Sequence, residues 1–227
     1  MKHGKKYNEA AKKVDREQSY DIAAACALVK DAHYCKFDET VEVHIRLNLK
    51  KSQSVRDTVV LPHQFHGEKK ILVFCKGEKE KEALDAGAAY AGADELIEKI
   101  KGGWLDFDVA VATPDMMKDV GKLGMVLGRK GLMPNPKTGT VTHDLKAAVA
   151  ELKKGRTEFR SDKTNIIHLA IGKVSMDPAQ VAANLGTLLD EVQRRRPSDT
   201  KGEFVTSVFL TSTMGPGVRV ALTKTER

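Results

Sequence analysis

The sequence predicts an α/β protein in which two kinds of strand pattern follow one another. Residues 40–49 alternate apolar and polar side chains, which is the period of a strand with one buried face. Residues 71–75 and 109–112 are continuous apolar runs, as expected of strands covered on both faces. From residue 157 onward the first pattern returns. We therefore expect an α+β domain with an antiparallel sheet and helices, plus an inserted three-layer Rossmann-like α/β domain.

The first part of the chain supplies a helix and a pair of strands. Apolar side chains at helical spacing, among them Cys26 and Val29, predict an amphipathic helix over residues 20–33. The alternating segment 40–49 follows as a half-buried strand. Residues 57–61 are interpreted as its hairpin partner, which would give an antiparallel pair.

The middle of the chain has the alternating order of a layered α/β domain. The two apolar strands at 71–75 and 109–112 are surrounded by segments with helical periodicity. These predicted helices cover residues 78–86, 93–101, 114–127 and 143–154. We place this domain at residues 68–156.

The last part of the chain supplies the partners that an antiparallel sheet near the N-terminus needs. A helix is predicted over 178–194, with Leu185 and Val192 on its apolar face. Strands are predicted at 157–161, 166–173, 203–211 and 218–222. We therefore assign residues 1–67 and 157–227 to one discontinuous domain.

The charge of the chain favours a polyanionic partner. The formal net charge is +7 and the pI is near 9.2. Residues 1–67 and 157–227 hold 22 Lys and Arg against 17 Asp and Glu, a net charge of +5, whereas 68–156 hold 16 against 14, a net charge of +2. Aromatic residues make up only 5% of the chain, so phosphate and shape contacts are expected to outweigh base stacking on many rings.

Cysteine usage and hydropathy predict a cytoplasmic protein with no membrane partner. The three cysteines, Cys26, Cys35 and Cys75, have no Cys-x-x-Cys spacing, and no charged-then-apolar leader opens the sequence. Apolar runs such as 71–75 are far shorter than the roughly 20 residues that cross a bilayer.

Several patterns that could belong to an enzyme or a metal site suit a structural role better, so we expect no catalytic residue, metal or cofactor. Residues 131–139 are predicted to form a shaped loop of prolines and glycines, neither helix nor strand, but Pro136 stands where a phosphate-binding loop needs glycine. His63 and His66 lack further metal ligands. Asp106 and Asp108 suit a strand-end turn better than paired catalytic carboxylates, and no dinucleotide fingerprint follows residues 71–75.

A series of short motifs carries a resemblance to a known family. The loop at 131–142 follows KLGMVLG at 122–128, and six further motifs occur in a set order. These motifs are KFDETVEV (36–43), LPH (61–63), KGEK (76–79), ATPD (112–115), RSDKT (160–164) and TMGP (213–216). Together they resemble the family of the bacterial large-subunit ribosomal protein one, the protein of the mobile ribosomal stalk. The resemblance also implies the discontinuous domain, with two connections acting as a hinge.

The first RNA-binding candidates lie in the 36–43 motif. From the residues alone, this segment is a capped connection from helix to strand with Phe37 in the core. The resemblance implies instead that it lies on the RNA-binding face. Lys36 would then contact a phosphate, Phe37 a sugar and base surface, and Thr40 and Glu42 would make polar contacts.

Two further segments complete the set of RNA-binding candidates. A hydroxyl-rich stretch between two strands can be an ordinary turn, but its chemistry also suits RNA, since hydroxyls can bond ribose 2′-hydroxyls. The resemblance implies that Thr213, Met214 and Gly215 lie at the rRNA. The candidates of this stretch are Thr211, Ser212, Thr213, Met214 and Gly215. The 160–164 motif adds Arg160 and Lys163 as phosphate ligands and His168 nearby, with a solvated hairpin turn as the alternative.

The resemblance implies a non-catalytic protein that acts as a monomer within the cytoplasmic ribosome. Its expected partners are large-subunit rRNA, the deacylated tRNA leaving the exit site, and its own messenger RNA, whose translation it would repress. The rival prediction is a cytoplasmic enzyme that binds a nucleotide or sugar phosphate in the inserted domain. The chain also departs from the family at Gln64, Phe65 and His66, and residues 221–227 have no predicted role.

Overall fold

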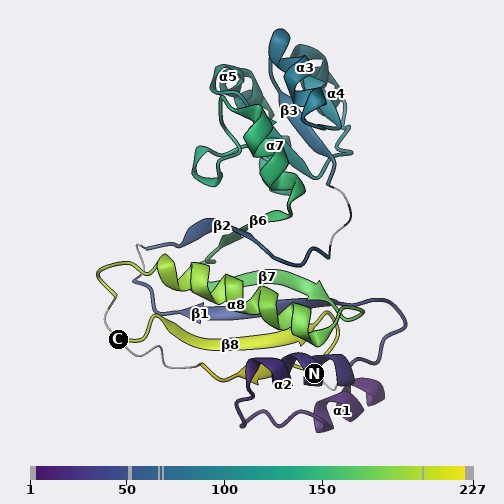
Figure 1. Ribbon diagram of the computed structural model, residues 1–227, viewed down its shortest axis with the longest axis vertical. Helices are drawn as coiled ribbons and strands as arrows, with labels where there is room; N and C mark the ends of the chain where they lie inside the picture. Colours follow the sequence, from purple (N-terminus) through teal and green to yellow (C-terminus); the bar gives the residue numbers. More distant parts are fainter. Residues whose placement is uncertain (1–3, 51–52, 66, 68, 201, 223–227) are drawn as a thin grey trace. The chain divides into compact units, whose positions relative to one another are not determined.

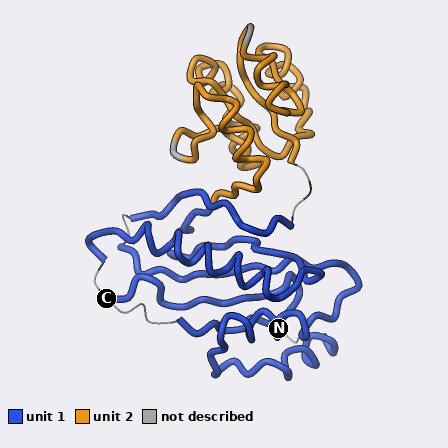
Figure 2. The backbone as a smooth tube through the Cα atoms, viewed as in Figure 1, with its two compact units in different colours: residues 1–65, 159–227 blue, residues 66–158 orange. Residues whose placement is uncertain are grey.

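A computed structural model shows that the chain divides into two compact units, and it confirms the predicted α/β class. Unit 1 comprises residues 1–65 and 159–227, and unit 2 comprises residues 66–158 (Figure 2). Both boundaries lie two residues from the expected ones. The structure describes residues 4–50, 53–65, 67, 69–200 and 202–222. His66, one of the three residues that depart from the family, and residues 223–227 of the tail without a predicted role therefore lie outside the described residues.

Unit 1 is built on a four-stranded antiparallel sheet (Figure 1). Its strand order is β7 (Ile166–Lys173), β1 (Thr40–Leu47), β8 (Val205–Ser212) and β9 (Val218–Val220). Helices α2 (Ile22–Asp31) and α8 (Pro178–Arg194) pack against one face of the sheet and against each other. The core of unit 1 lies in this helix-covered layer.

The sequence explains both helices. Asp177 caps α8 by accepting a hydrogen bond from the Ala179 amide at 3.1 Å, and Pro178 occupies the first helical position, where a missing N–H costs nothing. The side chains that α8 buries follow the predicted stripe and include Leu185 and Val192. In the same way α2 buries Ala25, Cys26 and Val29.

The alternation along β1 separates a buried face from an open one. Val41, Val43, Ile45 and Leu47 point into the core. The intervening side chains lie on the opposite face of the sheet, where they remain partly or fully exposed. We call this the open face; it carries Thr40, Glu42, His44 and Arg46 from β1, His168 and Ala170 from β7, Phe209 and Thr211 from β8, and Arg219 from β9.

The predicted hairpin between residues 40–49 and 57–61 is wrong. The second segment forms β2 (Arg56–Val60), which pairs with β6 (Arg156–Arg160) in a separate two-stranded sheet. Both edges of β1 are already occupied, by β7 on one side and β8 on the other, so no edge remains for β2. Asp57 on β2 forms an ion pair with Arg195, just after α8.

Unit 2 has the predicted three layers. Its parallel sheet has the order β4 (Tyr90–Gly92), β3 (Ile71–Phe74) and β5 (Val109–Ala112). Helices α3 (Glu78–Asp85) and α7 (Leu145–Lys153) contribute to the core on one side of the sheet. Helices α4 (Asp94–Lys101), α5 (Met117–Val120) and α6 (Gly124–Lys130) contribute to the core on the other side.

Some elements of the middle and the start of the chain differ from their predictions. The single helix expected over 114–127 is divided: it begins as a 3-10 turn at Pro114–Met116 and is interrupted by a second at Gly121–Leu123, where glycines weaken a continuous helix. Helix α1 (Lys5–Lys12) and strand β4 were not predicted. The loop at 131–139 is confirmed except that Pro136–Thr138 form a 3-10 turn: Gly131 and Gly139 both have positive φ, and the Thr140 hydroxyl accepts a hydrogen bond from the Asn135 amide at 2.7 Å.

Candidate nucleic-acid interface

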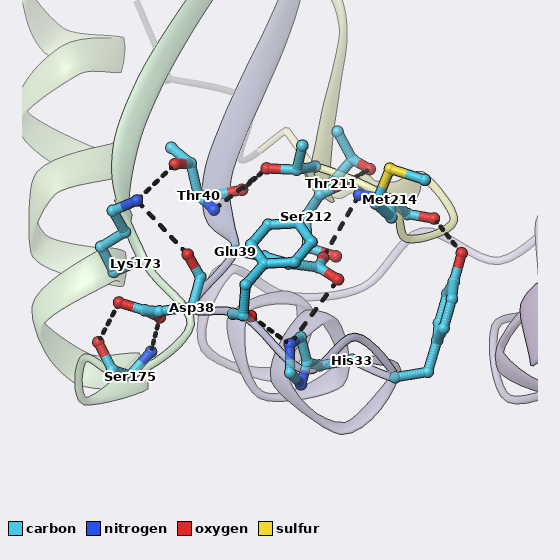
Figure 3. Close-up of polar contacts among 12 residues, drawn as sticks. His33, Asp38, Glu39, Thr40, Lys173, Ser175, Thr211, Ser212 and Met214 are labelled. Carbon is cyan, nitrogen blue, oxygen red and sulfur yellow. Dashed lines mark hydrogen bonds and ion pairs between the residues drawn. The ribbon is translucent and has the colours of Figure 1, made fainter.

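The loop between β8 and β9 is held against the first residue of β1 (Figure 3). The Thr213 amide donates to the Thr40 carbonyl at 3.1 Å. In return the Thr40 amide donates to Thr213 Oγ1 at 3.1 Å. The Thr211 hydroxyl has two acceptors within reach of its single proton, the Ser212 carbonyl at 2.8 Å and the Gly215 carbonyl at 3.1 Å. We call residues 211–217, which are the last two residues of β8 and the loop that follows, the Met214 loop.

Both backbone polar groups of Met214 are engaged in hydrogen bonds within the protein, which leaves its side chain to meet a partner. The Met214 amide donates to Glu39 Oε2 at 3.4 Å, and the Tyr34 hydroxyl donates to the Met214 carbonyl at 2.8 Å (Figure 3). The Met214 side chain remains 51% exposed. A flexible thioether in this position can fill a shallow surface such as the minor groove of RNA.

Glu39 is a buried carboxylate beneath the Met214 loop, with no exposed surface. Burial acts to raise its pKa, but the surrounding polar groups outweigh burial and hold that pKa below its ordinary value. These groups are the Cys35 thiol, the Ser212 hydroxyl, the Met214 amide and the His33 ring, whose Nε2 lies 3.7 Å from Oε1. Among the described residues, neither Ser212 Oγ nor Glu39 Oε1 makes a hydrogen bond of regular geometry.

The segment before β1 presents two of the predicted contact residues to solvent. Phe37 is 53% exposed, so the interpretation of it as a core residue is wrong. Lys36 is also exposed, and the described residues give its ammonium group no hydrogen bond or ion pair. Asp38, next in the chain, accepts from the Ser175 amide at 3.0 Å and from the Ser175 hydroxyl at 2.9 Å, which anchors the segment.

Thr40 and Glu42 continue the site onto the open face. The Thr40 hydroxyl accepts a hydrogen bond from Lys173 Nζ at 2.9 Å (Figure 3). Glu42 is paired across the sheet with Ala170 on β7 and Thr211 on β8. The candidates from the 36–43 motif and from the Met214 loop therefore lie together at one end of β1.

Arg160, Lys163 and His168 lie toward the other end of the same strands. Arg46 on β1 pairs with Ile166, whereas Thr40 pairs with Lys173, so about 20 Å of strand separates these two pairs. Arg160 ends β6 and Lys163 lies within the turn before β7, and both are exposed; His168 is the second residue after Ile166. The sequence did not reveal this separation.

The turn itself is organised by Asp162. Its Oδ1 accepts from the Ile166 amide and the Thr164 amide, both at 2.8 Å. The hydrogen bond from Ile166 is the main cause that lowers the pKa of Asp162 to about 2. His168 Nε2 lies 3.6 Å from Asp162 Oδ2, and on the other side His168 Nδ1 lies 2.7 Å from Nδ1 of His44.

Two predicted RNA-contact residues have their hydroxyl groups buried or hydrogen-bonded within the protein, and one residue of the site was not predicted from the sequence. Ser212 is only 2% exposed, which is at odds with the direct RNA contact predicted for it. The Thr213 hydroxyl already bonds the Thr40 backbone, so part of its hydrogen-bonding capacity is used within the protein. Glu39 was not predicted, because an acidic residue before a strand gives no sequence signal that it will be buried.

We expect Gly215→Ala to disturb the Met214 loop through a specific clash. A Cβ atom on Gly215 would lie 2.3 Å from Ser212 Oγ, so the buried hydroxyl must move from its present position. The free energy of unfolding should fall by about 1 kcal/mol, which urea denaturation will measure. Gly217→Ala is the control, because its Cβ meets nothing closer than 4.0 Å. In a protein that already carries Ser212→Ala, the Gly215→Ala substitution should cost much less free energy of unfolding. If the effects of the two substitutions on this free energy simply add, the clash is not the explanation.

Other kinds of site find no support among the described residues. They include no group of three or more His, Cys, Asp or Glu side chains arranged to hold a metal ion. None of their helices combines the length and the apolar character needed to cross a membrane.

Comparison with known proteins agrees with the resemblance seen in the sequence. Residues 28–216 match the model of the ribosomal protein L1p/L10e family. The chain is 64% identical over 220 residues to the large ribosomal subunit protein uL1 of Treponema denticola, covering 97% of each chain. It is 58% identical to the protein of the same name from Borrelia hermsii, covering 96% of this chain and 98% of the relative. The chain therefore belongs to the ribosomal protein L1p/L10e family.

Proposed function

We propose that this protein, a ribosomal protein of the large subunit, binds large-subunit rRNA through unit 1. The observation that supports this most is the Met214 loop, whose backbone is fixed by Glu39, Tyr34 and Thr40 while its side chain remains exposed. A binding surface of this kind loses little conformational entropy when it meets a rigid partner. Membership of a ribosomal protein family decides against the rival prediction of an enzyme.

The exposed groups suit an RNA partner that is recognised by backbone and shape. Lys36, and at the far end of β1 Arg160 and Lys163, are exposed cations that can contact phosphates. Phe37 and Met214 offer apolar surface to ribose and base edges. Glu42 can accept from a 2′-hydroxyl or an exocyclic amine.

We further propose that the protein assists release of deacylated tRNA from the exit site, with unit 2 as the mobile part. The support is the division into two units that have separate hydrophobic cores, joined by two chain connections. Such a division permits relative motion of the units without loss of either core.

The role of Lys36 is tested by the salt dependence of binding. We expect Lys36→Ala to weaken rRNA binding and to lower the magnitude of the log-log salt slope by about 0.7 to 0.9, because one phosphate contact is lost. Thr213→Val is the matched comparison: it removes a neutral hydrogen bond to Thr40 and should weaken binding without changing the slope. Filter binding at several salt concentrations measures both. An unchanged slope for Lys36→Ala would remove this lysine from the phosphate contacts.

We also propose that the free protein represses translation of its own messenger RNA with the same surface. A surface that recognises ribose groups and RNA shape can also bind a messenger RNA that folds like the rRNA site. Feedback on synthesis of the protein requires that it binds rRNA more tightly than this messenger. A difference of about 1.4 kcal/mol gives a tenfold preference for rRNA. We expect Met214→Ala to weaken both complexes, and an unlabelled rRNA fragment to displace labelled messenger. One protein molecule that holds both RNAs at once would contradict a shared surface.

A further inference from the structure

Four side chains form a row across the open face of unit 1, one from each strand. His44 on β1 is paired with His168 on β7 and with Phe209 on β8, and Phe209 is paired with Arg219 on β9. We call these four residues the ring row. Strands β7, β1 and β8 lie side by side in Figure 1. Because neighbouring strands are about 4.8 Å apart, the row crosses the face at the spacing of the sheet.

The ring row is accessible to a partner. Phe209 is 37% exposed, and the side chain of His168 is 51% exposed. Arg219 is exposed as well. The neighbour of the Phe209 ring at the end of the Met214 loop is Gly217, where a Cβ would lie 4.0 Å from the ring, so no side chain at this position covers Phe209.

The two histidines of the row hold each other in place. Their Nδ1 atoms lie 2.7 Å apart, which requires one ring to donate and the other to accept a hydrogen bond. The ring centroids are 5.0 Å apart with an interplanar angle of 63°. The row therefore presents preorganised rings next to the phenyl ring of Phe209.

We infer that the ring row is a stacking site for an unpaired base of the bound RNA strand. This inference rests on the proposed rRNA binding and extends it along the sheet. Thr211 of the Met214 loop lies two residues from Phe209 on β8, and Glu42 lies two residues from His44 on β1, so the row adjoins the candidate interface. Exposed aromatic rings on an antiparallel sheet stack bases that are splayed out of a helix.

The row has charges of both signs beside it, Asp162 next to His168 and Glu42 next to His44, as well as two arginines that can contact an RNA backbone. Arg219 ends the row, and Arg46 lies on β1 two residues beyond His44, so cations are placed to meet the phosphates that flank a stacked base. Phe209 is the one large apolar side chain of the row. A docking site for a protein would instead present a wider apolar patch.

Phe209→Leu is the direct test, because it keeps an apolar side chain and removes the ring. We expect this variant of the full chain to bind the large-subunit rRNA fragment of the stalk about tenfold more weakly, with an unchanged salt slope. Leu84→Ala, which truncates a 51% exposed side chain on α3 of unit 2, should bind like the parent. Thermal unfolding of each variant verifies that the fold is retained.

A second measurement reports stacking directly. The chain contains one tryptophan, Trp104, in unit 2. The double variant Trp104→Phe and Phe209→Trp therefore has a single indole fluorophore, placed in the ring row. We expect the rRNA fragment to quench its fluorescence in proportion to binding.

The outcomes separate this inference from the function on which it rests. Equal affinity of Phe209→Leu and the parent, while Lys36→Ala loses affinity, overturns the stacking site and leaves rRNA binding intact. A bound complex of the double variant in which the indole fluorescence is not quenched also overturns it. Failure of the parent chain to bind the rRNA fragment overturns the proposed function and the stacking site together.

Discussion

A fragment that joins residues 1–65 to 159–227 through a short linker should bind the rRNA fragment nearly as tightly as the full chain. Residues 66–158 alone should bind about a hundredfold more weakly or worse, as expected when only non-specific contacts remain. The reason is that every candidate contact residue, from Lys36 and Phe37 to Arg160 and the Met214 loop, lies in unit 1. Filter binding of the two fragments and the full chain measures the difference.

Both fragments are expected to fold, so a difference between their rRNA affinities would not be due to unfolding. Unit 1 has its own core around β1 and α8, and unit 2 has a core on each side of its parallel sheet. Circular dichroism of each fragment is the control. If folded residues 66–158 bind rRNA as tightly as the full chain, the assignment of binding to unit 1 is wrong.

The second large effect is expected at Glu39, which we interpret as the residue that positions the Met214 loop. Glu39→Ala should lower the free energy of unfolding by about 3 kcal/mol, since it leaves a cavity and removes a buried carboxylate from its partners. Binding of rRNA should weaken too, because the Met214 amide loses its acceptor. Glu39→Gln keeps an acceptor oxygen there, so it should lie between the parent and Glu39→Ala in both measurements. A Glu39→Ala variant with parental stability and affinity would contradict a positioning role.

The pKa of Glu39 adds a dependence on pH. Its hydrogen-bonding surroundings outweigh burial and hold the pKa below the ordinary value of 4.5, so the folded state binds the proton less readily than the unfolded chain does. The stabilisation is therefore present above pH 4.5 and is lost as the pH falls through the lowered pKa. Urea unfolding between pH 6 and pH 3 should show a shallower loss of stability for Glu39→Gln. Parallel curves for the variant and the parent would contradict this.

The elements best predicted from the sequence were those whose pattern is local. Helix α8 has its predicted bounds because a capping Asp177, a Pro178 and an apolar stripe all lie within the segment. The alternation in β1 and the continuous apolar runs of β3 and β5 likewise predicted which strands are covered on one face or on both. The motifs added the family, and with it the set of candidate residues.

Long-range contacts account for what the sequence left open. The partner of β2 is β6 because β7 and β8 occupy both edges of β1, and strand periodicity carries no information about which edge is free. The burial of Glu39 depends on the Met214 loop, and Met214 lies 175 residues away from Glu39 in the chain. The ring row exists only because the register between four strands places His168, His44, Phe209 and Arg219 side by side, and register is a property of paired strands.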